Sequence, residues 1–241
     1  MTLMEFVGCA CTAYGPAFAL FIITIMHDPI RIIILVASAF FWLLALLMAS
    51  LFWNFVTFRT CMLLCVIVSV IFQEAFRYCI YILLRKAETG LKKMHVPNTN
   101  TDVLNNKHIV PYVSGLGYGV MSGAFSLVNI LAELSGPGTM GLNGASHYFC
   151  LVTSIFTMIF TLLHTFWSVI FFTGVDRKNY FLIGWVIGSH LLVSCMTLFN
   201  NNQMYLLTMI SAVLVLIISA YTAFNVCRRR YISEHNIVVH N

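Results

Sequence analysis

Charged residues are scarce in this chain of 241 residues: they make up 9% of the sequence, whereas 60% of it is hydrophobic. A soluble domain carries about 25% charged residues, so this composition excludes a soluble globular surface. A helix that crosses a bilayer needs about 20 mostly apolar residues. Seven segments meet that requirement, at 2–26, 30–55, 60–84, 110–132, 148–174, 180–199 and 204–227. We therefore predict one all-α membrane domain over 1–241, a polytopic transmembrane helical bundle with seven spans.

The chain also lacks the marks of several familiar classes. The first segment has neither a basic start nor a small-residue cleavage site, so we interpret it as a retained span. No Asp lies inside a predicted span, although an intramembrane aspartyl protease needs a facing pair. The HExxH pattern of a zinc protease is absent too, and so are the Asp-Arg-Tyr and Asn-Pro-x-x-Tyr motifs of seven-span receptors. We expect no metal site and no cofactor.

The basic residues predict the orientation of the bundle, because Lys and Arg in short loops favour the cytosolic side. Of the 13 Lys and Arg residues, Arg59 falls on one side and Arg77 lies within a span. The others share the opposite side: Arg31, Arg85, Lys86, Lys92, Lys93, Lys107, Arg177, Lys178 and Arg228 to Arg230. With seven spans, the N-terminus is then lumenal or extracellular and the C-terminus cytosolic.

Two segments are predicted to lie in the cytosol. A linker at 85–109 connects the third and fourth spans, and a tail at 228–241 follows the last span. Pro97 to Asp102 gives the linker a composition that favours turns over a packed unit. The net charge of +5 is explained by topology and by contact with anionic membrane lipids, so we expect no nucleic-acid partner. Cys227, beside three arginines at the inner end of the last span, fits a palmitoylation site.

Glycines in the fourth span form a register. Gly115, Gly119 and Gly123 are four residues apart, so they share one helix face and leave it without side chains. Small residues in such a register let two helices approach closely in lipid. The pattern predicts a helix-packing and assembly surface, with a flexible gating helix as the alternative. Gly184 and Gly188 form a second, weaker pair in the sixth span.

Ionisable residues within the spans are few. Glu74 and Arg77, three residues apart, share a helix face and are predicted to form an intramembrane ion pair. A charge at the bilayer centre costs about 2.5–3.5 kcal/mol on insertion scales, so both groups need a partner. Contact with another subunit is the alternative to a pair that fixes helix position.

His164 and His190 each lie about ten residues from an inner helix end, which places both near the bilayer midplane. Sequential antiparallel helices bring side chains of equal depth toward one interior. We interpret the histidines as polar packing anchors that hydrogen-bond across helices. A proton relay or a metal site is the alternative, and a metal site needs a third ligand.

Other functions remain open on the residues alone. Ser146, within Gly-Ala-Ser-His, is compatible with an intramembrane hydrolase of the rhomboid type that uses His190 as its base. A seven-span receptor or transporter is the other alternative.

Segments along most of the chain match one known family in order. They include Gly15 to Phe21, Phe40-Phe41-Trp42, Gln73-Glu74, Phe76-Arg77, Tyr112 to Leu116 with the glycine register, Asn129 to Ala132, Gly136-Pro137-Gly138, Leu163 to Trp167 and Gly188 to Leu192. Through these segments the chain resembles the anterior pharynx-defective family, the seven-span scaffold subunit of the γ-secretase complex. The linker at 85–109 and the tail match poorly.

The resemblance implies a non-catalytic subunit that binds nicastrin, presenilin and presenilin enhancer. It implies that Gly115, Gly119 and Gly123 support assembly, and that His164 and His190 support packing and contact with presenilin. Presenilin would then cleave type I membrane proteins such as Notch and the amyloid precursor protein. The implied locations are the endoplasmic reticulum, Golgi, plasma membrane and endosomal membranes.

Overall fold

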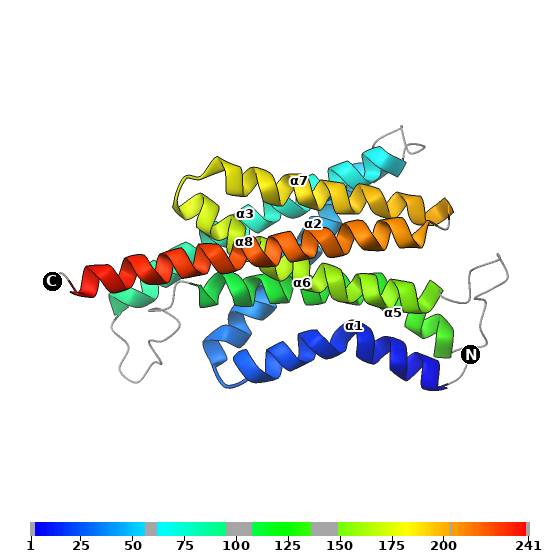
Figure 1. The fold of residues 1–241 in the computed structure, drawn as a ribbon, viewed down its shortest axis with the longest axis horizontal. Helices are drawn as coiled ribbons and strands as arrows, with labels where there is room; N and C mark the ends of the chain where they lie inside the picture. The colour runs from blue at the N-terminus through cyan, green and yellow to red at the C-terminus, as the bar shows by residue number, and fades with distance from the viewer. Residues whose placement is uncertain (1–2, 56–61, 95–107, 136–148, 203, 240–241) are drawn as a thin grey trace.

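A computed structural model describes residues 3–55, 62–94, 108–135, 149–202 and 204–239 (Figure 1). These residues are all-helical, as predicted, and contain no strand. The elements are α1 (Leu3–Thr24), α2 (Pro29–Phe55), α3 (Met62–Met94), α5 (Ile109–Ser135), α6 (Phe149–Asp176), α7 (Tyr180–Met196), the 3-10 helix η1 (Thr197–Asn202) and α8 (Tyr205–Val239).

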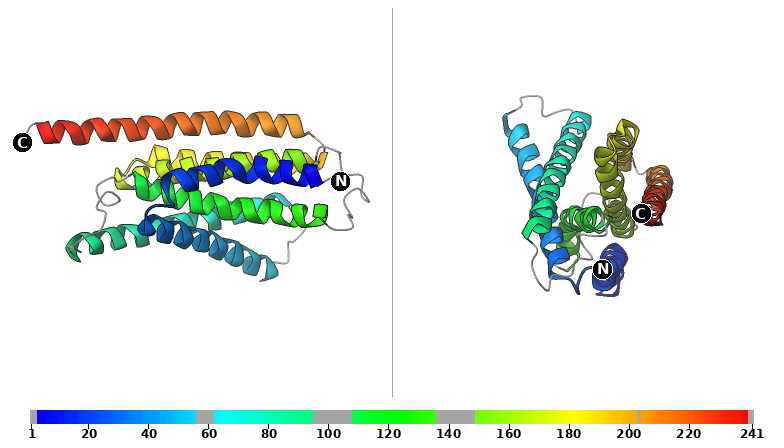
Figure 2. Two further views of the ribbon diagram at one scale, coloured as in Figure 1. Left: turned by 90° about the horizontal axis from the view of Figure 1, so that it is seen from below. Right: turned by 90° about the vertical axis from the view of Figure 1, so that its left-hand side faces the viewer.

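Six of these helices are long and apolar enough to cross a membrane, namely α1, α2, α3, α6, α7 continued into η1, and α8. A chain with several such helices is a multi-pass membrane protein. The remaining helix, α5, carries the glycine register. Its 27 residues would span about 40 Å, and it runs alongside its neighbours in the bundle (Figure 2).

The centre of the bundle is α6. Within its most apolar stretch 72% of residues are buried, against 17–28% for the other five membrane-length helices. α5, α8, α1 and α7 all pack against it, and α2 and α3 complete the bundle on the far side of α5 and α7. Hydrophobic side chains of α6 such as Leu163, Trp167, Ile170 and Phe172 are fully buried and form the middle of the core.

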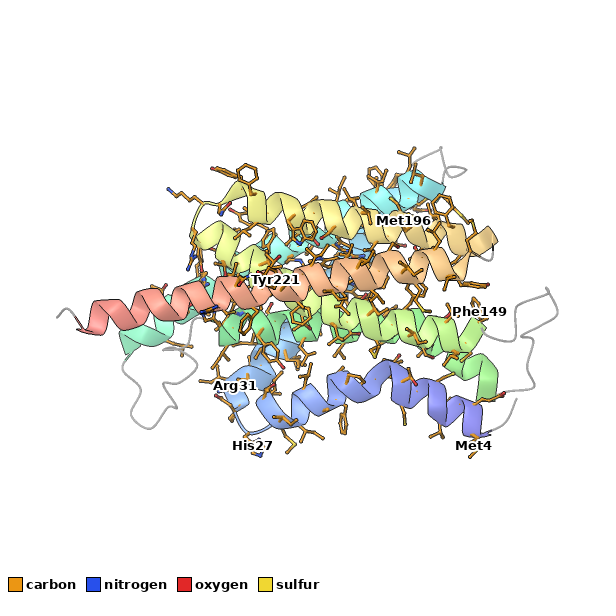
Figure 3. The ribbon with its side chains drawn as sticks, in the orientation of Figure 1. Met4, His27, Arg31, Phe149, Met196 and Tyr221 are labelled. Atoms are coloured by element: carbon orange, nitrogen blue, oxygen red, sulfur yellow. The ribbon has the colours of Figure 1, made fainter. Side chains whose placement is uncertain are left out.

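The helix ends fall into two groups. The α1–α2 turn, the α6–α7 turn and the C-terminal end of α8 lie at one end of the bundle, and the N-terminus lies at the other (Figure 1). Figure 3 places Arg31 at the first end and Met4, Phe149 and Met196 at the second. We call the first end, which also carries Arg177, Lys178 and Arg228, the basic end.

Three helix boundaries differ from those expected from the sequence. α3 continues to Met94, so residues 85–94 of the predicted linker are helical. Two ion pairs of Arg85 accompany the extension, one with Glu88 at 2.7 Å and one with Asp176 of α6. The pair with Glu88, three residues on, favours the helical conformation here. α7 ends at Met196 and tightens into η1, where three consecutive asparagines are poor helix formers. α8 continues through the predicted tail to Val239.

Candidate polar core and glycine interface

The glycine register of α5 faces α6. A β-carbon placed on Gly119 would lie 2.5 Å from the carbonyl oxygen of Thr161, and one placed on Gly115 would lie 2.8 Å from the Cα of Thr165. A β-carbon on Gly123 would meet the Thr161 hydroxyl at 2.9 Å. Real β-carbons do not come so close to backbone atoms, so α5 and α6 reach this separation because the side chains are absent.

A fourth glycine opens the opposite face of α5. A β-carbon on Gly117 would collide with the backbone carbonyl of Leu35 on α2. Close to it, the Ser38 hydroxyl of α2 donates to the Ser114 hydroxyl of α5 at 2.9 Å, deep in the bundle. α5 is therefore clamped at backbone distance between α2 and α6. By contrast, no described atom lies within 4 Å of a β-carbon on Gly184 or Gly188 of α7.

Threonines on α6 form the surface that receives the register. Thr157, Thr161 and Thr165 are four residues apart, and each hydroxyl donates to the carbonyl oxygen four residues earlier at 2.9 Å. The Thr161 hydroxyl also lies 3.2 Å from the carbonyl oxygen of Gly119. The interface therefore keeps its hydroxyl groups hydrogen-bonded within the bundle, as a lipid-embedded interface requires.

Glu74 and Arg77 of α3 form an ion pair at the centre of a buried polar cluster. We call this cluster, which also contains Tyr118, His164, Ser168 and His190, the polar core. Nε of Arg77 lies 3.0 Å from Oε2 of Glu74, and Nη2 lies 3.2 Å from Oε1, so the pairing is bidentate. Arg77 has no exposed surface, and Glu74 is 5% exposed. The guanidinium also lies over the ring of Tyr118 on α5, 4.7 Å from its centroid. Burial of both charges is tolerable only because each neutralises the other.

Arg77 has five N–H donors, and the structure gives an acceptor to each of them. Besides the two bonds to Glu74, Nη1 donates to the Ser168 hydroxyl at 2.5 Å and to the carbonyl oxygen of His164 at 3.3 Å. Nη2 donates its second hydrogen bond to Nδ1 of His164 at 2.8 Å. One side chain of α3 is thus bonded three times to α6.

The two histidines meet at this ion pair. Because a guanidinium can only donate, Nδ1 of His164 must accept, which places its ring proton on Nε2. His190 of α7 uses Nδ1 to bind Oε1 of Glu74 at 2.7 Å, where the carboxylate accepts. The two rings lie 5.1 Å apart, edge to face, and the ring of Trp167 packs against both. The histidines therefore attach α6 and α7 to the same pair on α3.

The hydrogen bonds of this cluster join side chains of α3, α6 and α7. The Ser168 hydroxyl accepts a hydrogen bond from Nη1 of Arg77. Within the described ranges, no three His, Cys, Asp or Glu side chains are grouped so as to hold a metal ion. Both histidines are occupied at Nδ1 by the ion pair. The cluster links α3, α5, α6 and α7 by direct contacts of a single buried ion pair.

Several participants were not predicted from the sequence. Ser168 and Tyr118 complete the surroundings of Arg77, and the Tyr118 hydroxyl donates to the carbonyl oxygen of Gln73 at 2.5 Å. Gly117 could have been found from the sequence, because a glycine two residues from Gly115 lies on the opposite helix face and indicates a second close helix contact there. Ser146 lies outside the described residues. Cys227, the predicted palmitoylation site, lies at the basic end with its Sγ 3.5 Å from Nδ1 of His108.

Comparison with known proteins identifies the family. The Aph-1 protein family model matches residues 4–230. The chain is 52% identical over 226 residues to the γ-secretase subunit Aph-1 of Drosophila melanogaster, covering 94% of each chain. It is 42% identical to γ-secretase subunit Aph-1b of Danio rerio and 40% identical to γ-secretase subunit APH-1B of Homo sapiens, covering 93% of this chain and 89% of theirs in both cases. The chain belongs to the Aph-1 family.

Proposed function

We propose that the chain is the non-catalytic scaffold subunit of a γ-secretase complex, where it assembles with presenilin, nicastrin and presenilin enhancer. The similarity to proteins named γ-secretase subunits, over nearly the whole length of each chain, is the observation that carries the proposal. Presenilin would cut the type I membrane substrates, among them Notch and the amyloid precursor protein. The subunit would act in the endoplasmic reticulum and Golgi and at the plasma and endosomal membranes.

The proposed mechanism is rigid packing. All five donors of Arg77 bind acceptors within the chain, so the polar core is available to fix helix positions and not to act on a substrate. The glycine register lies against α6, and its assembly role would be indirect: close packing of α5 and α6 shapes the outer faces that partners contact. Large apolar side chains exposed on α8, including Leu206, Ile217 and Phe224, offer such a face.

His164 and His190 would act on presenilin at a distance. Their side chains are 1% and 2% exposed in this chain, so neither is positioned for direct contact from outside. We propose that they hold α6 and α7 at the depth set by Glu74 and thereby present the surface of α7. Loss of either ring would shift a helix and weaken the complex as a whole.

The topology is part of the same proposal. α5, the fourth helix along the chain, also crosses the membrane and brings the number of spans to seven, and the basic end faces the cytosol. α5 packs against α1, α2 and α6 and so lies inside the bundle, parallel to helices of membrane length. A seven-span chain with its C-terminus at the basic end has a lumenal or extracellular N-terminus, by the positive-inside rule. The linker and the tail would then be cytosolic parts of a single membrane domain.

The scaffold is distinguished from an enzyme by a double variant, His164→Ala with His190→Ala, expressed with the partner subunits. We expect native gels to show loss of the full complex, while any complex that does form keeps its specific activity. Leu162→Ala with Leu192→Ala is a matched control that truncates less buried apolar side chains of the same two helices. Normal assembly of the histidine variant combined with complete loss of proteolysis would favour an enzyme over a scaffold.

A further inference from the structure

An apolar groove of about 770 Å³ opens on the bundle surface between α3, α6 and α7. Its walls include Ile71, Ala75, Phe171, Val175, Ile183 and Ile187. Glu74 lies at its inner wall, where Arg77 and His190 already bind both carboxylate oxygens. The groove therefore presents a hydrocarbon surface whose one buried charge is neutralised from within.

The groove runs along the bundle axis from the basic end. Tyr78 and Ile71 line it on α3, and Tyr180 and Ile187 line it on α7, each pair seven residues apart. Seven residues of helix rise about 10 Å, which compares with about 15 Å for the hydrocarbon of one leaflet. Because α3 and α7 run in opposite directions, Tyr78 and Tyr180 lie toward the basic end and the isoleucines lie toward the middle. The groove matches one leaflet in depth and direction.

Lys178 lines the mouth of the groove, in the turn between α6 and α7. Its φ is 53°, and among the described residues it alone combines a side chain with a left-handed backbone. Its N–H bonds the carbonyl oxygen of Val175, and the N–H of Asn179 bonds that of Gly174, so the turn caps α6 at a position where glycine is the usual residue. Arg177 already supplies a cation to that helix end. A lysine here is thus unfavourable for the turn but places a positive charge at the groove.

We propose that the groove binds one anionic phospholipid, with an acyl chain along the isoleucine walls and the phosphate at Lys178. The apolar walls fit hydrocarbon, and the lysine complements a net negative headgroup. Tyr180 is 79% exposed at the mouth, a place where tyrosine rings sit at headgroup level. Occupation of the groove in cells rests on the proposed cytosolic orientation of the basic end, because anionic lipids are concentrated in that leaflet.

The test uses the purified complex in nanodiscs of phosphatidylcholine with phosphatidylserine, and lipids retained are identified by native mass spectrometry. Wild type should retain phosphatidylserine in preference to phosphatidylcholine. Lys178→Gly should lower this preference about fivefold, the effect of one basic residue near the surface. It should also unfold at the same or a higher temperature, since glycine suits the left-handed turn.

Two matched variants separate the groove from general charge. Arg177→Gln removes the neighbouring cation, which does not line the groove, and should keep the preference. Ile187→Trp fills the groove and should displace both lipids while Lys178 stays in place. Equal retention of the two lipids by wild type, an unchanged preference in Lys178→Gly, or a groove filled only by a partner helix would overturn the proposal.

Nanodiscs carry both lipids in both leaflets, so the result does not depend on which end faces the cytosol. A chain that binds phosphatidylserine but has an inverted topology would refute the orientation and not the binding site. Protease protection of a C-terminal epitope tag in sealed microsomes reads the orientation separately.

Discussion

Replacement of Arg77 by methionine is the most informative perturbation of the polar core. The change removes every donor that binds Glu74 on α3, and it also removes the bonds to Ser168 and His164. Glu74 is 5% exposed, so its carboxylate would remain buried with His190 as its one remaining partner. Removing one member of a buried pair costs about 3–5 kcal/mol.

We expect the free energy of unfolding of Arg77→Met to fall by about 3 kcal/mol, the lower part of that range, because His190 still binds the carboxylate. At about 1.4 kcal/mol per factor of ten, this is a change of more than 100-fold in the folding equilibrium. Denaturant unfolding of the detergent-solubilised chain measures it. Glu74→Gln should recover part of the loss when added to Arg77→Met, since the uncompensated charge is then gone.

The stability regained when Glu74→Gln is added to Arg77→Met is the decisive measurement. If Arg77→Met with Glu74→Gln is as unstable as the sum of the two single variants, the side chains do not act as a pair. A loss below about 1 kcal/mol for Arg77→Met alone would place the pair in the class of exposed ion pairs and refute the buried core described above.

Further predictions concern the helix contacts. Gly119→Leu should destabilise the chain by about 3 kcal/mol, the upper end of the usual cost of overpacking, because the new side chain meets the backbone of α6. Gly188→Leu, whose side chain meets no neighbouring helix, should change stability by less than about 0.5 kcal/mol. Thermal unfolding of both variants in one detergent compares them, and equal losses would contradict the packing described. Gly117→Ala should also lower the unfolding temperature, because its methyl group meets the backbone of Leu35, and an unchanged temperature would show that α2 can move aside. Asp176→Asn should cost about 1 kcal/mol or less in the same assay, since its bridge to Arg85 is partly exposed, and a much larger loss would mean that this end of α3 is fixed chiefly by the bridge.

Features that depend on one helix could be predicted from the sequence. The ion pair of Glu74 and Arg77 was predicted because residues three apart on a helix are neighbours, and the structure has it at 3.0 Å. The glycine register was visible for the same reason. Hydropathy placed the helices, because a spanning segment must be apolar along most of its length.

Features that depend on contact between helices could not be read from the sequence. Nothing in Gly115, Gly119 and Gly123 says that α6 receives them, and the threonines of α6 look like ordinary small residues until the two helices are seen together. Ser168 and Tyr118 join the core through the crossing of α6 and α5 with α3. The sequence predicts a linker at 85–109 because this polar stretch ends in a turn-favouring composition at Pro97 to Asp102, whereas α3 continues to Met94 and carries the ion pair of Arg85 with Glu88.

The central claim, that this chain is a non-catalytic scaffold, is tested most directly by affinity purification of the tagged chain in mild detergent, with its partners quantified and a fluorogenic γ-secretase substrate added. We predict equimolar presenilin, nicastrin and presenilin enhancer with the chain, proteolysis by that complex, and no proteolysis by the chain purified alone. Cleavage of the substrate by the isolated chain, or its recovery without these partners, would contradict the account.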